Sequence, residues 1–303
     1  MGFSNKNIEY VIVGIGEILW DILPDGKILG GAPTNFAYHV ANIGHKGIII
    51  SAVGKDPLGD EIIKTIARNN LSRDYIQVKS RKKTGRVEVE IVNKFKPHYI
   101  IHKNVAWDFI KFDNKLELLA KKVDAVCFGS LAQRSLVSRY TIKRFVESVN
   151  NNTVKVFDVN LRQNYYSRPI IINSMKLCSI LKFNEEELSI IINMLNLEKK
   201  KNEKDYCKLI IDEYDLKLMC LTKGKNGSLI MDRSDYFYYT GNRINIVDTV
   251  GAGDAFTAAM VIQYLNGENL EEISRSANFL GSWVASKRGP TPTYSKEILH
   301  KVF

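Results

Sequence analysis

Long apolar runs are missing from this sequence. A membrane-spanning helix needs about eighteen or more consecutive apolar residues, and no stretch of the chain approaches that length. The first residues, Met-Gly-Phe-Ser-Asn-Lys-Asn, carry no apolar core behind a basic segment, so they do not match a signal peptide. We therefore expect a cytoplasmic protein with no membrane partner.

Cysteine is scarce, and its spacing indicates no paired site. The four cysteines, at 127, 178, 207 and 220, are far apart and form no CxxC motif. This spacing argues against a zinc site and against a disulfide framework. We expect reduced thiols, as in other cytosolic folds.

Two nucleotide-binding patterns are also absent. No Gly-Lys-Ser/Thr follows the glycines at 251 and 253, which excludes a Walker loop there. Leu19 stands where a dinucleotide fingerprint that begins with Gly14 and Gly16 would need its third glycine. A dinucleotide-binding fold is therefore a poor match.

The positive charge is not concentrated in one place. The chain has a formal net charge of +10, but its lysines are scattered, and the densest cluster, at 198–204, also contains acidic residues. A solvated linker explains that cluster better than a nucleic-acid surface, so we expect no nucleic-acid partner. A mild positive field would still help to attract anionic nucleotides.

The order of the expected elements indicates an α/β fold. With 303 residues, the chain can form one large domain or two medium ones. Residues 9–15 form a β-branched run that is typical of a strand buried on both faces. From about residue 113, expected strands alternate with helices, which predicts a doubly wound, mainly parallel sheet flanked by helices. Expected hairpins at 17–31 and 85–104 break this rhythm and predict a small second sheet.

Residues 247–265 join a short glycine-rich loop to a long apolar helix, and we place the chemistry there. Gly251 and Gly253 lack a Cβ, so their backbone can approach another molecule closely. The helix start attracts phosphate, and Asp254 sits at the same point. Amides that neutralise a phosphoryl group beside a carboxylate that accepts a proton suit phosphoryl transfer. The alternative from the residues alone is that Asp254 only caps the helix.

Further polar residues follow other expected strands. Gly30 and Gly31 precede a helix that Pro33 opens, and alone they indicate a tight turn. Arg162 could clamp an anion or could pair with Asp158 at the surface. Asn184 is equally compatible with an N-cap. From the residues alone, the turn at 223–227 is an ordinary Asn-Gly hairpin connection.

Residues 248–256, Asp-Thr-Val-Gly-Ala-Gly-Asp-Ala-Phe, resemble the C-terminal motif of the PfkB (ribokinase-like) family of sugar kinases. Residues 52–59, the Asn-x-x-Glu at 184–187 and the Thr-x-Gly at 222–224 resemble other motifs of the same family, in family order. The resemblance covers essentially the whole chain. It implies one ribokinase-like domain over residues 1–303, with a β-sheet lid formed by about 17–31 and 85–105.

The resemblance also implies roles for individual residues, with ATP and Mg²⁺ as cofactors. Asp254 would be the catalytic base, and Gly251, Ala252 and Gly253 would hold the developing charge with their amides. Asp21, Gly30, Gly31, Asn35, Asn160 and Arg162 would contact the sugar. Asn184, Thr222, Gly224 and Asn278 would bind the nucleotide, Glu187 would bind Mg²⁺ through water, and Asp248 and Val250 would help to hold a monovalent cation such as K⁺.

Within the family, the segments 20–24, 104–108 and 158–162 look most like fructokinases. The resemblance therefore implies transfer of the γ-phosphate of MgATP to the primary hydroxyl of D-fructose. Arg86 departs from the usual lid sequence and could favour an acidic sugar, which keeps a 2-keto-3-deoxygluconate kinase or a ribokinase-type activity open. A sugar-binding regulator on the same fold is the non-enzymatic alternative. The exposed lid sheet could also pair two copies in a homodimer.

Overall fold

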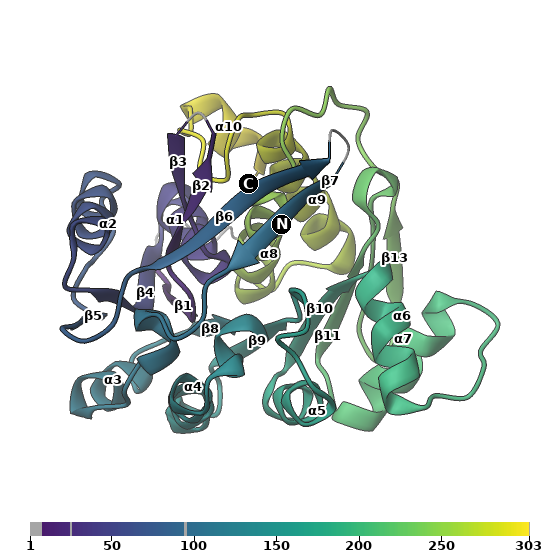
Figure 1. Cartoon of the computed structure of the whole chain (residues 1–303). Coiled ribbons are helices and arrows are strands. Elements are labelled where there is room, and N and C mark those ends of the chain that lie inside the picture. The colour runs from purple at the N-terminus through teal and green to yellow at the C-terminus, as the bar shows by residue number, and fades with distance from the viewer. Residues whose placement is uncertain (1–7, 25, 94–95, 303) are drawn as a thin grey trace.

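The computed structural model describes residues 8–24, 26–93 and 96–302, and it contains two β-sheets (Figure 1). The larger sheet has nine strands in the order β13-β12-β11-β10-β9-β8-β1-β4-β5. Its strands are β1 (Val11–Ile15), β4 (Lys46–Gly54), β5 (Ile76–Lys79), β8 (Ala125–Phe128), β9 (Val154–Asp158), β10 (Ile180–Asn184), β11 (Leu218–Thr222), β12 (Ser228–Met231) and β13 (Tyr236–Tyr239). The strands from β11 to β5 pair in parallel, while β12 and β13 add an antiparallel edge.

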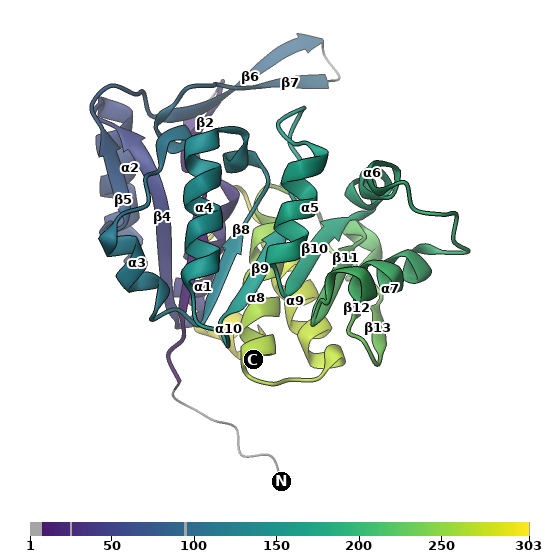
Figure 2. The same ribbon diagram turned by 90° about the horizontal axis from the view of Figure 1, so that it is seen from below.

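The smaller sheet has the strand order β3-β2-β6-β7. It combines a hairpin of β2 (Leu19–Leu23) and β3 (Gly26–Gly30) with a hairpin of β6 (Gly85–Asn93) and β7 (Lys96–Ile101). The two hairpins join through a parallel pairing of β2 with β6. In Figure 2, β6 and β7 form an arm that extends across one end of the main sheet. The second sheet is thus formed by the predicted lid segments; Asp25 and residues 94–95 of those segments lie outside the described residues.

Helices cover both faces of the main sheet (Figures 1 and 2). One face carries α3 (Asn114–Ala120), α4 (Leu136–Ser148), α5 (Arg168–Leu177), α6 (Glu185–Leu195) and α7 (Glu203–Tyr214). The other carries α1 (Ala32–Ile43), α2 (Pro57–Arg68), α8 (Ala252–Leu265), α9 (Leu270–Ala285) and α10 (Lys296–Val302). Short 3₁₀ helices follow three strands: η1 (Ala106–Phe109), η2 (Leu131–Arg134) and η3 (Gly224–Asn226).

Strand β1 is buried on both faces, because its alternate side chains pack into two different cores. Val13 and Ile15 pack into the core on the α4 side, and Ile12 packs into the core on the α8 side. A strand buried on both faces needs apolar residues at successive positions, as the sequence predicts. The predicted fold class, a mainly parallel sheet flanked by helices with a smaller second sheet, is confirmed.

Most expected helices and strands are found within a few residues of their predicted ends. Helix α1 has Pro33 in its first turn and ends at Gly44, whose φ of 106° is left-handed. Helix α2 is capped by Asp56, whose side chain accepts from the Gly59 N–H. Strands β5 and β13, at the two edges of the main sheet, and helix α10 were not predicted from the sequence.

Candidate active site

Helix α8 starts in a conformation that requires glycine. Gly251 has φ 76°, and a Cβ there would lie 2.5 Å from the Pro290 Cβ. Gly253 is exposed at the helix start, and a Cβ on it would lie 3.6 Å from the Lys182 Nζ. Between them, the Ala252 N–H donates to the Thr249 carbonyl at 3.3 Å. The predicted phosphate-binding turn is thus a helix N-terminus with a lysine ammonium close by.

Asp254 is tied to the first helix of the chain. Its Oδ2 accepts a hydrogen bond from the Asn35 Nδ2 at 2.8 Å. Burial raises the pKa of Asp254 to about 7, although the bond from Asn35 opposes the rise. Asp254, Asn160 and Thr257 line one small cleft beside the start of α1. A carboxyl group with this pKa in a cleft is suited to accept a proton near neutral pH.

The predicted sugar end brings Asp21 and the glycine pair together. Burial raises the pKa of Asp21 to about 6, with the Arg162 charge acting against the rise. A Cβ on Gly30 would lie 2.3 Å from the Asp21 Oδ2, so any larger residue at position 30 would clash with that carboxylate. Gly31 has φ 108°, and its backbone packs on the Glu17 carbonyl. Asp21, Gly30 and Gly31 therefore form one compact unit next to α1.

The three other predicted sugar contacts differ in their surroundings. Asn160 has φ 41°, an uncommon value for asparagine, and lines the Asp254 cleft. The Arg86 Nε forms an ion pair with the Glu88 Oε1 at 2.9 Å. Arg162 is exposed and donates to the Leu161 carbonyl. Of these three, only Asn160 lines the Asp254 cleft.

Asp158 pairs with Lys182, not with Arg162 as the surface alternative supposed. Strands β9 and β10 place the two residues opposite each other, and the Lys182 Nζ lies 3.0 and 2.8 Å from the Asp158 oxygens. Thr257 of α8 donates to Asp158 Oδ2 at 2.9 Å. Burial lowers the pKa of Lys182, but the Asp158 charge and bonds more than reverse this and raise it. Lys182 thus stays charged behind the start of α8.

Sequence reasoning missed Lys182 as a site residue. The signal was present, since a lysine between Leu181 and Phe183 interrupts an otherwise apolar strand. Its meaning depends on the order and register of β9 and β10, which the sequence does not show.

The predicted magnesium residue also has a structural role. Asn184 and Glu187 form a capping box at the start of α6. The Glu187 Oε2 accepts from the Asn184 N–H at 2.9 Å, and its Oε1 accepts from the Leu161 N–H at 2.7 Å. With both oxygens engaged by backbone, contact with Mg²⁺ through water fits Glu187 better than direct ligation. Among the described residues, no group of three or more His, Cys, Asp or Glu side chains could hold a metal.

The predicted nucleotide residues lie at neighbouring strand ends. Thr222 is opposite Asn184 in the β10–β11 register, and Gly224 follows with φ 54°. Asn278 of α9 is buried and donates to the Ser228 Oγ at 2.7 Å. Because Ser228 is opposite Thr222 in β12, these residues converge on one end of the sheet.

The segments predicted to hold a monovalent cation meet at Gly251. The Asp248 side chain accepts from the Val250 N–H at 3.0 Å and from the Gly289 N–H at 3.1 Å. These bonds hold the turn before α8 against residues 289–290. The role of Asp248 and Val250 in cation binding stays a prediction.

A buried histidine connects this loop to α1. The His39 Nε2 lies 3.0 Å from the Pro290 carbonyl oxygen and its Nδ1 lies 2.8 Å from the Tyr294 hydroxyl. Because a carbonyl only accepts, Nε2 carries the proton and Nδ1 accepts from Tyr294. Burial lowers the pKa of His39 to about 3, so the ring stays neutral. The helix that carries Asn35 therefore also positions the residue that packs on Gly251.

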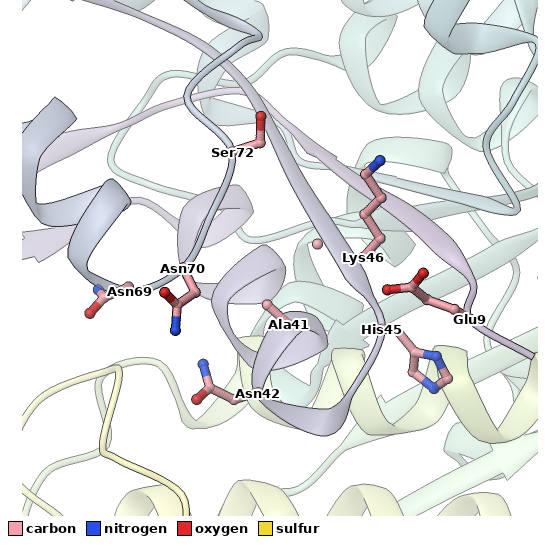
Figure 3. A pocket seen from close by; sticks show the side chains of 9 residues that line it. Glu9, Ala41, Asn42, His45, Lys46, Asn69, Asn70 and Ser72 are labelled. Atoms are coloured by element: carbon pink, nitrogen blue, oxygen red, sulfur yellow. The ribbon is translucent and has the colours of Figure 1, made fainter. Parts of the chain in front are cut away.

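Another hollow lies at the opposite end of the main sheet, where β4 begins. Glu9, Asn42, Lys46, Asn70 and Ser72 are among the residues that line it (Figure 3). None of the predicted site residues is found there.

No helix in the described parts of the chain is long and apolar enough to cross a membrane.

The chain is similar to known sugar kinases in sequence and in fold. An uncharacterized sugar kinase of Pyrococcus horikoshii, PH1459, is 28% identical over 96% of this chain and 95% of its own length. Its crystal structure in complex with ATP matches with a TM-score of 0.82 at 27% identity, over 97% of this chain and 100% of that one. The fructokinase of Escherichia coli is 26% identical over 82% of each chain.

A 2-dehydro-3-deoxygluconokinase of Thermotoga maritima matches with a TM-score of 0.81 over 97% of this chain and 99% of that one, but at 20% identity it shows likeness of fold alone. The model of the family described as pfkB family carbohydrate kinase matches residues 25–297. Since that match spans most of the sequence, the chain belongs to the pfkB family of carbohydrate kinases.

Proposed function

We propose that this carbohydrate kinase transfers the γ-phosphate of MgATP to the primary hydroxyl of D-fructose, giving fructose 6-phosphate. The observation that carries the proposal is the position of Asp254. Its carboxyl group has a pKa of about 7, lines a cleft, and sits at the start of α8 beside Lys182. One helix terminus thus offers a base and an anion site within reach of each other.

In the proposed reaction, Asp254 accepts the proton of the primary hydroxyl as the hydroxyl oxygen attacks the γ-phosphate. The bond from Asn35 holds the carboxylate in place. The amides of Gly251, Gly253 and Asp254 and the Lys182 ammonium stabilise charge on the phosphoryl group, while the Ala252 N–H, also predicted to take part, donates to the Thr249 carbonyl. Glu187 would hold Mg²⁺ through water, and the ion would supply positive charge near the phosphates. Asn184, Thr222, Gly224 and Asn278 would surround the nucleotide. Asp248 and Val250 would help to hold K⁺.

Two features favour a neutral sugar over an acidic one. Asp21 and Asp254 lie at the sugar end, and carboxylates accept hydrogen bonds from hydroxyl groups but repel an acid. The Arg86 charge, which could attract an acid, is already paired with Glu88. The fructokinase name of the Escherichia coli relative agrees with this preference. Phosphorylation of 2-keto-3-deoxygluconate is the second candidate, because Arg162 is exposed and a guanidinium can bind a carboxylate through two hydrogen bonds.

The test is ADP release measured with D-fructose, D-ribose, 2-keto-3-deoxygluconate and a nucleoside. We expect the highest kcat/KM with fructose. The Asp254→Asn variant should lose about 10²–10⁴-fold in kcat and keep its affinity for the sugar, because it removes the base but little volume. Asp124→Asn, at the opposite end of β1, is the matched control and should keep wild-type kinetics.

Each outcome has a clear meaning. A preference for 2-keto-3-deoxygluconate would replace fructose but keep the kinase. Sugar binding without ADP release by the wild type would indicate the regulatory alternative. Normal turnover by Asp254→Asn would show that Asp254 is not the base.

A further inference from the structure

Glu17 is a buried carboxylate to which the proposed reaction assigns no task. It lies between the end of β1 and the start of β2, and it is 3% exposed. Its Oε2 has no hydrogen-bond partner among the residues that the structure describes. Burial raises its pKa, although the N–H groups of Glu17 and Ala32 and the charges of Arg162 and Arg134 act against the rise. An unpartnered buried carboxylate oxygen is costly, so it needs a reason.

Another buried glutamate of this protein has different surroundings. Glu187 is also buried, at 5% exposure, but each of its carboxylate oxygens accepts a backbone N–H. The fold thus supplies a partner for each carboxylate oxygen of Glu187. Glu17 keeps one oxygen available.

Of the other unpartnered polar atoms among the described residues, we consider those of Asn35 and Arg134. The Asn35 Oδ1 is buried without a partner in the described part of the chain, while the amide nitrogen of the same side chain holds Asp254. The Arg134 Nη1 is likewise buried and unpartnered there. Its other nitrogens bond to Asp108, and its guanidinium lies 4.0 Å from the ring centroid of Trp107. The set contains two acceptors and one donor.

These atoms lie at one end of the main sheet. Strands β1 and β8 are neighbours, and the segments that follow them carry Glu17 and Arg134. A Cβ on Gly16 would lie 3.4 Å from the Ala132 Cβ, so η2 packs directly on the segment that holds Glu17. The Arg162 charge acts on Glu17 as well as on Asp21 and Asp254. The Glu17 carbonyl accepts from the Thr34 hydroxyl at 3.3 Å and lies against Gly31, whose neighbour Gly30 packs on Asp21. Glu17 therefore lies beside the residues of the sugar end.

We propose that Glu17 is a specificity-determining residue whose Oε2 accepts a hydrogen bond from a sugar hydroxyl other than the one that is phosphorylated. Sugar hydroxyls donate and accept at once, which matches the acceptors on Glu17 and Asn35 and the donor on Arg134. A site built to bond a hydroxyl discriminates strongly against a ligand that lacks it, because its buried polar groups are then left unpaired. This inference rests on the proposed kinase function and specifies how its sugar is chosen.

The test combines Glu17→Gln with removal of single hydroxyl groups from the sugar. The probes are D-fructose and its 1-deoxy, 3-deoxy and 4-deoxy analogues, with KM and kcat measured for each and sugar binding measured by calorimetry. Glu17→Gln should raise the KM for fructose about ten-fold or more, because a bond to a charged acceptor is lost. The KM for ATP should stay within about two-fold, and kcat should change less than the sugar KM.

One deoxy analogue should behave differently from the others. The wild type should already bind weakly the analogue that lacks the hydroxyl bound by Glu17. For this analogue, Glu17→Gln should therefore raise the KM by less than about two-fold. The thermal midpoint of Glu17→Gln should equal or exceed that of the wild type, because a buried, unpaired charge is removed. Asp124→Asn, which removes a carboxylate at the other end of β1, should show no change in sugar KM.

Failure of the inference and failure of the proposed function can be told apart. If the wild type releases ADP with none of the sugars in the panel, the kinase function fails and the Glu17 inference falls with it. If another sugar of the panel is the substrate, that sugar and its monodeoxy analogues replace the fructose series. If the wild type is active but Glu17→Gln leaves every sugar KM unchanged, or raises all of them by one common factor, the inference about Glu17 is wrong.

Discussion

The raised pKa of the Asp254 carboxyl group predicts how activity depends on pH. Its pKa is raised to about 7 by burial, from a usual value of 3.8. If Asp254 is the base, kcat/KM should rise about ten-fold per pH unit below about pH 7 and level off above it. A profile measured from pH 5 to pH 9 with fructose and ATP checks this. A rate already at its plateau at pH 5 would contradict the assignment.

The same pKa shift should make the folded protein less stable as the pH rises, whereas activity should increase. The folded state holds the Asp254 proton up to about pH 7, whereas the unfolded chain releases it near pH 4. This contribution is therefore present below about pH 4 and is lost as the pH rises through 7. Asp254→Asn should unfold at a higher temperature than the wild type at pH 8, and the gap should close at pH 4.

At the scale of elements, α1 contacts both Asp254 and the segment that packs on the turn before α8. Asn35 on this helix holds Asp254, and His39, one turn later, holds Pro290 against Gly251. His39→Phe should leave the Pro290 carbonyl and the Tyr294 hydroxyl unpaired, at about 1–3 kcal/mol for each buried group. Urea unfolding measures this loss. We also expect a lower kcat, since Pro290 packs on the turn that starts α8.

Tyr294→Phe is the matched control for His39→Phe, because it removes only the hydroxyl that bonds Nδ1. Its loss of stability should be smaller. The pH dependence offers a second check: the folded pKa of about 3 means that only the unfolded chain takes up the His39 proton between pH 6.5 and 3. The advantage of the wild type over His39→Phe should therefore shrink as the pH falls from 7 to 5. An unchanged gap would contradict the buried, neutral histidine.

The sequence predicts those elements whose signals are local. Pro33 and Gly44 mark the ends of α1, and the apolar run at 9–15 predicts β1, because capping and burial act within a few residues. Strand β13, Tyr-Phe-Tyr-Tyr, and strand β5 are only four residues long and lie at sheet edges, where the pattern is weak. Motifs and spacing also led to Asp254, Asn35 and Asp21. Lys182, His39 and Glu17 could not be identified from the sequence. Their importance depends on partners far along the chain, or on the lack of a partner, and only the folded structure shows this.

At the scale of the whole molecule, the lid arm can be tested separately from the main sheet. Strands β6 and β7 extend beyond the rest of the protein in Figure 2, and Val89 is opposite Tyr99 in their register. Replacing residues 90–98 by Asn-Gly should close the shortened hairpin with a two-residue turn. We expect retained folding and a sugar KM raised about ten-fold, because a shorter lid shields the sugar less, with a smaller effect on the ATP KM. An unchanged sugar KM would show that the arm does not cover the substrate.

The shortened variant also tests the predicted homodimer. The lid sheet has free edges at β3 and β7, and unpaired strand edges can join two copies. If the lid joins two copies, sedimentation should give twice the chain mass of 34.4 kDa for the wild type and the single mass for the variant. A wild-type monomer would contradict the lid-mediated dimer.

The bond between Asn35 and Asp254 joins residues that are 219 positions apart in the sequence. During synthesis, the ribosome delivers the amide long before the carboxylate that it must orient. An incomplete polypeptide that ends before α8 lacks both Asp254 and the glycine turn before it, whatever other part of the chain has already folded. On the proposed roles of Asp254 and this turn, fragments that stop before α8 should bind sugar without consuming nucleotide.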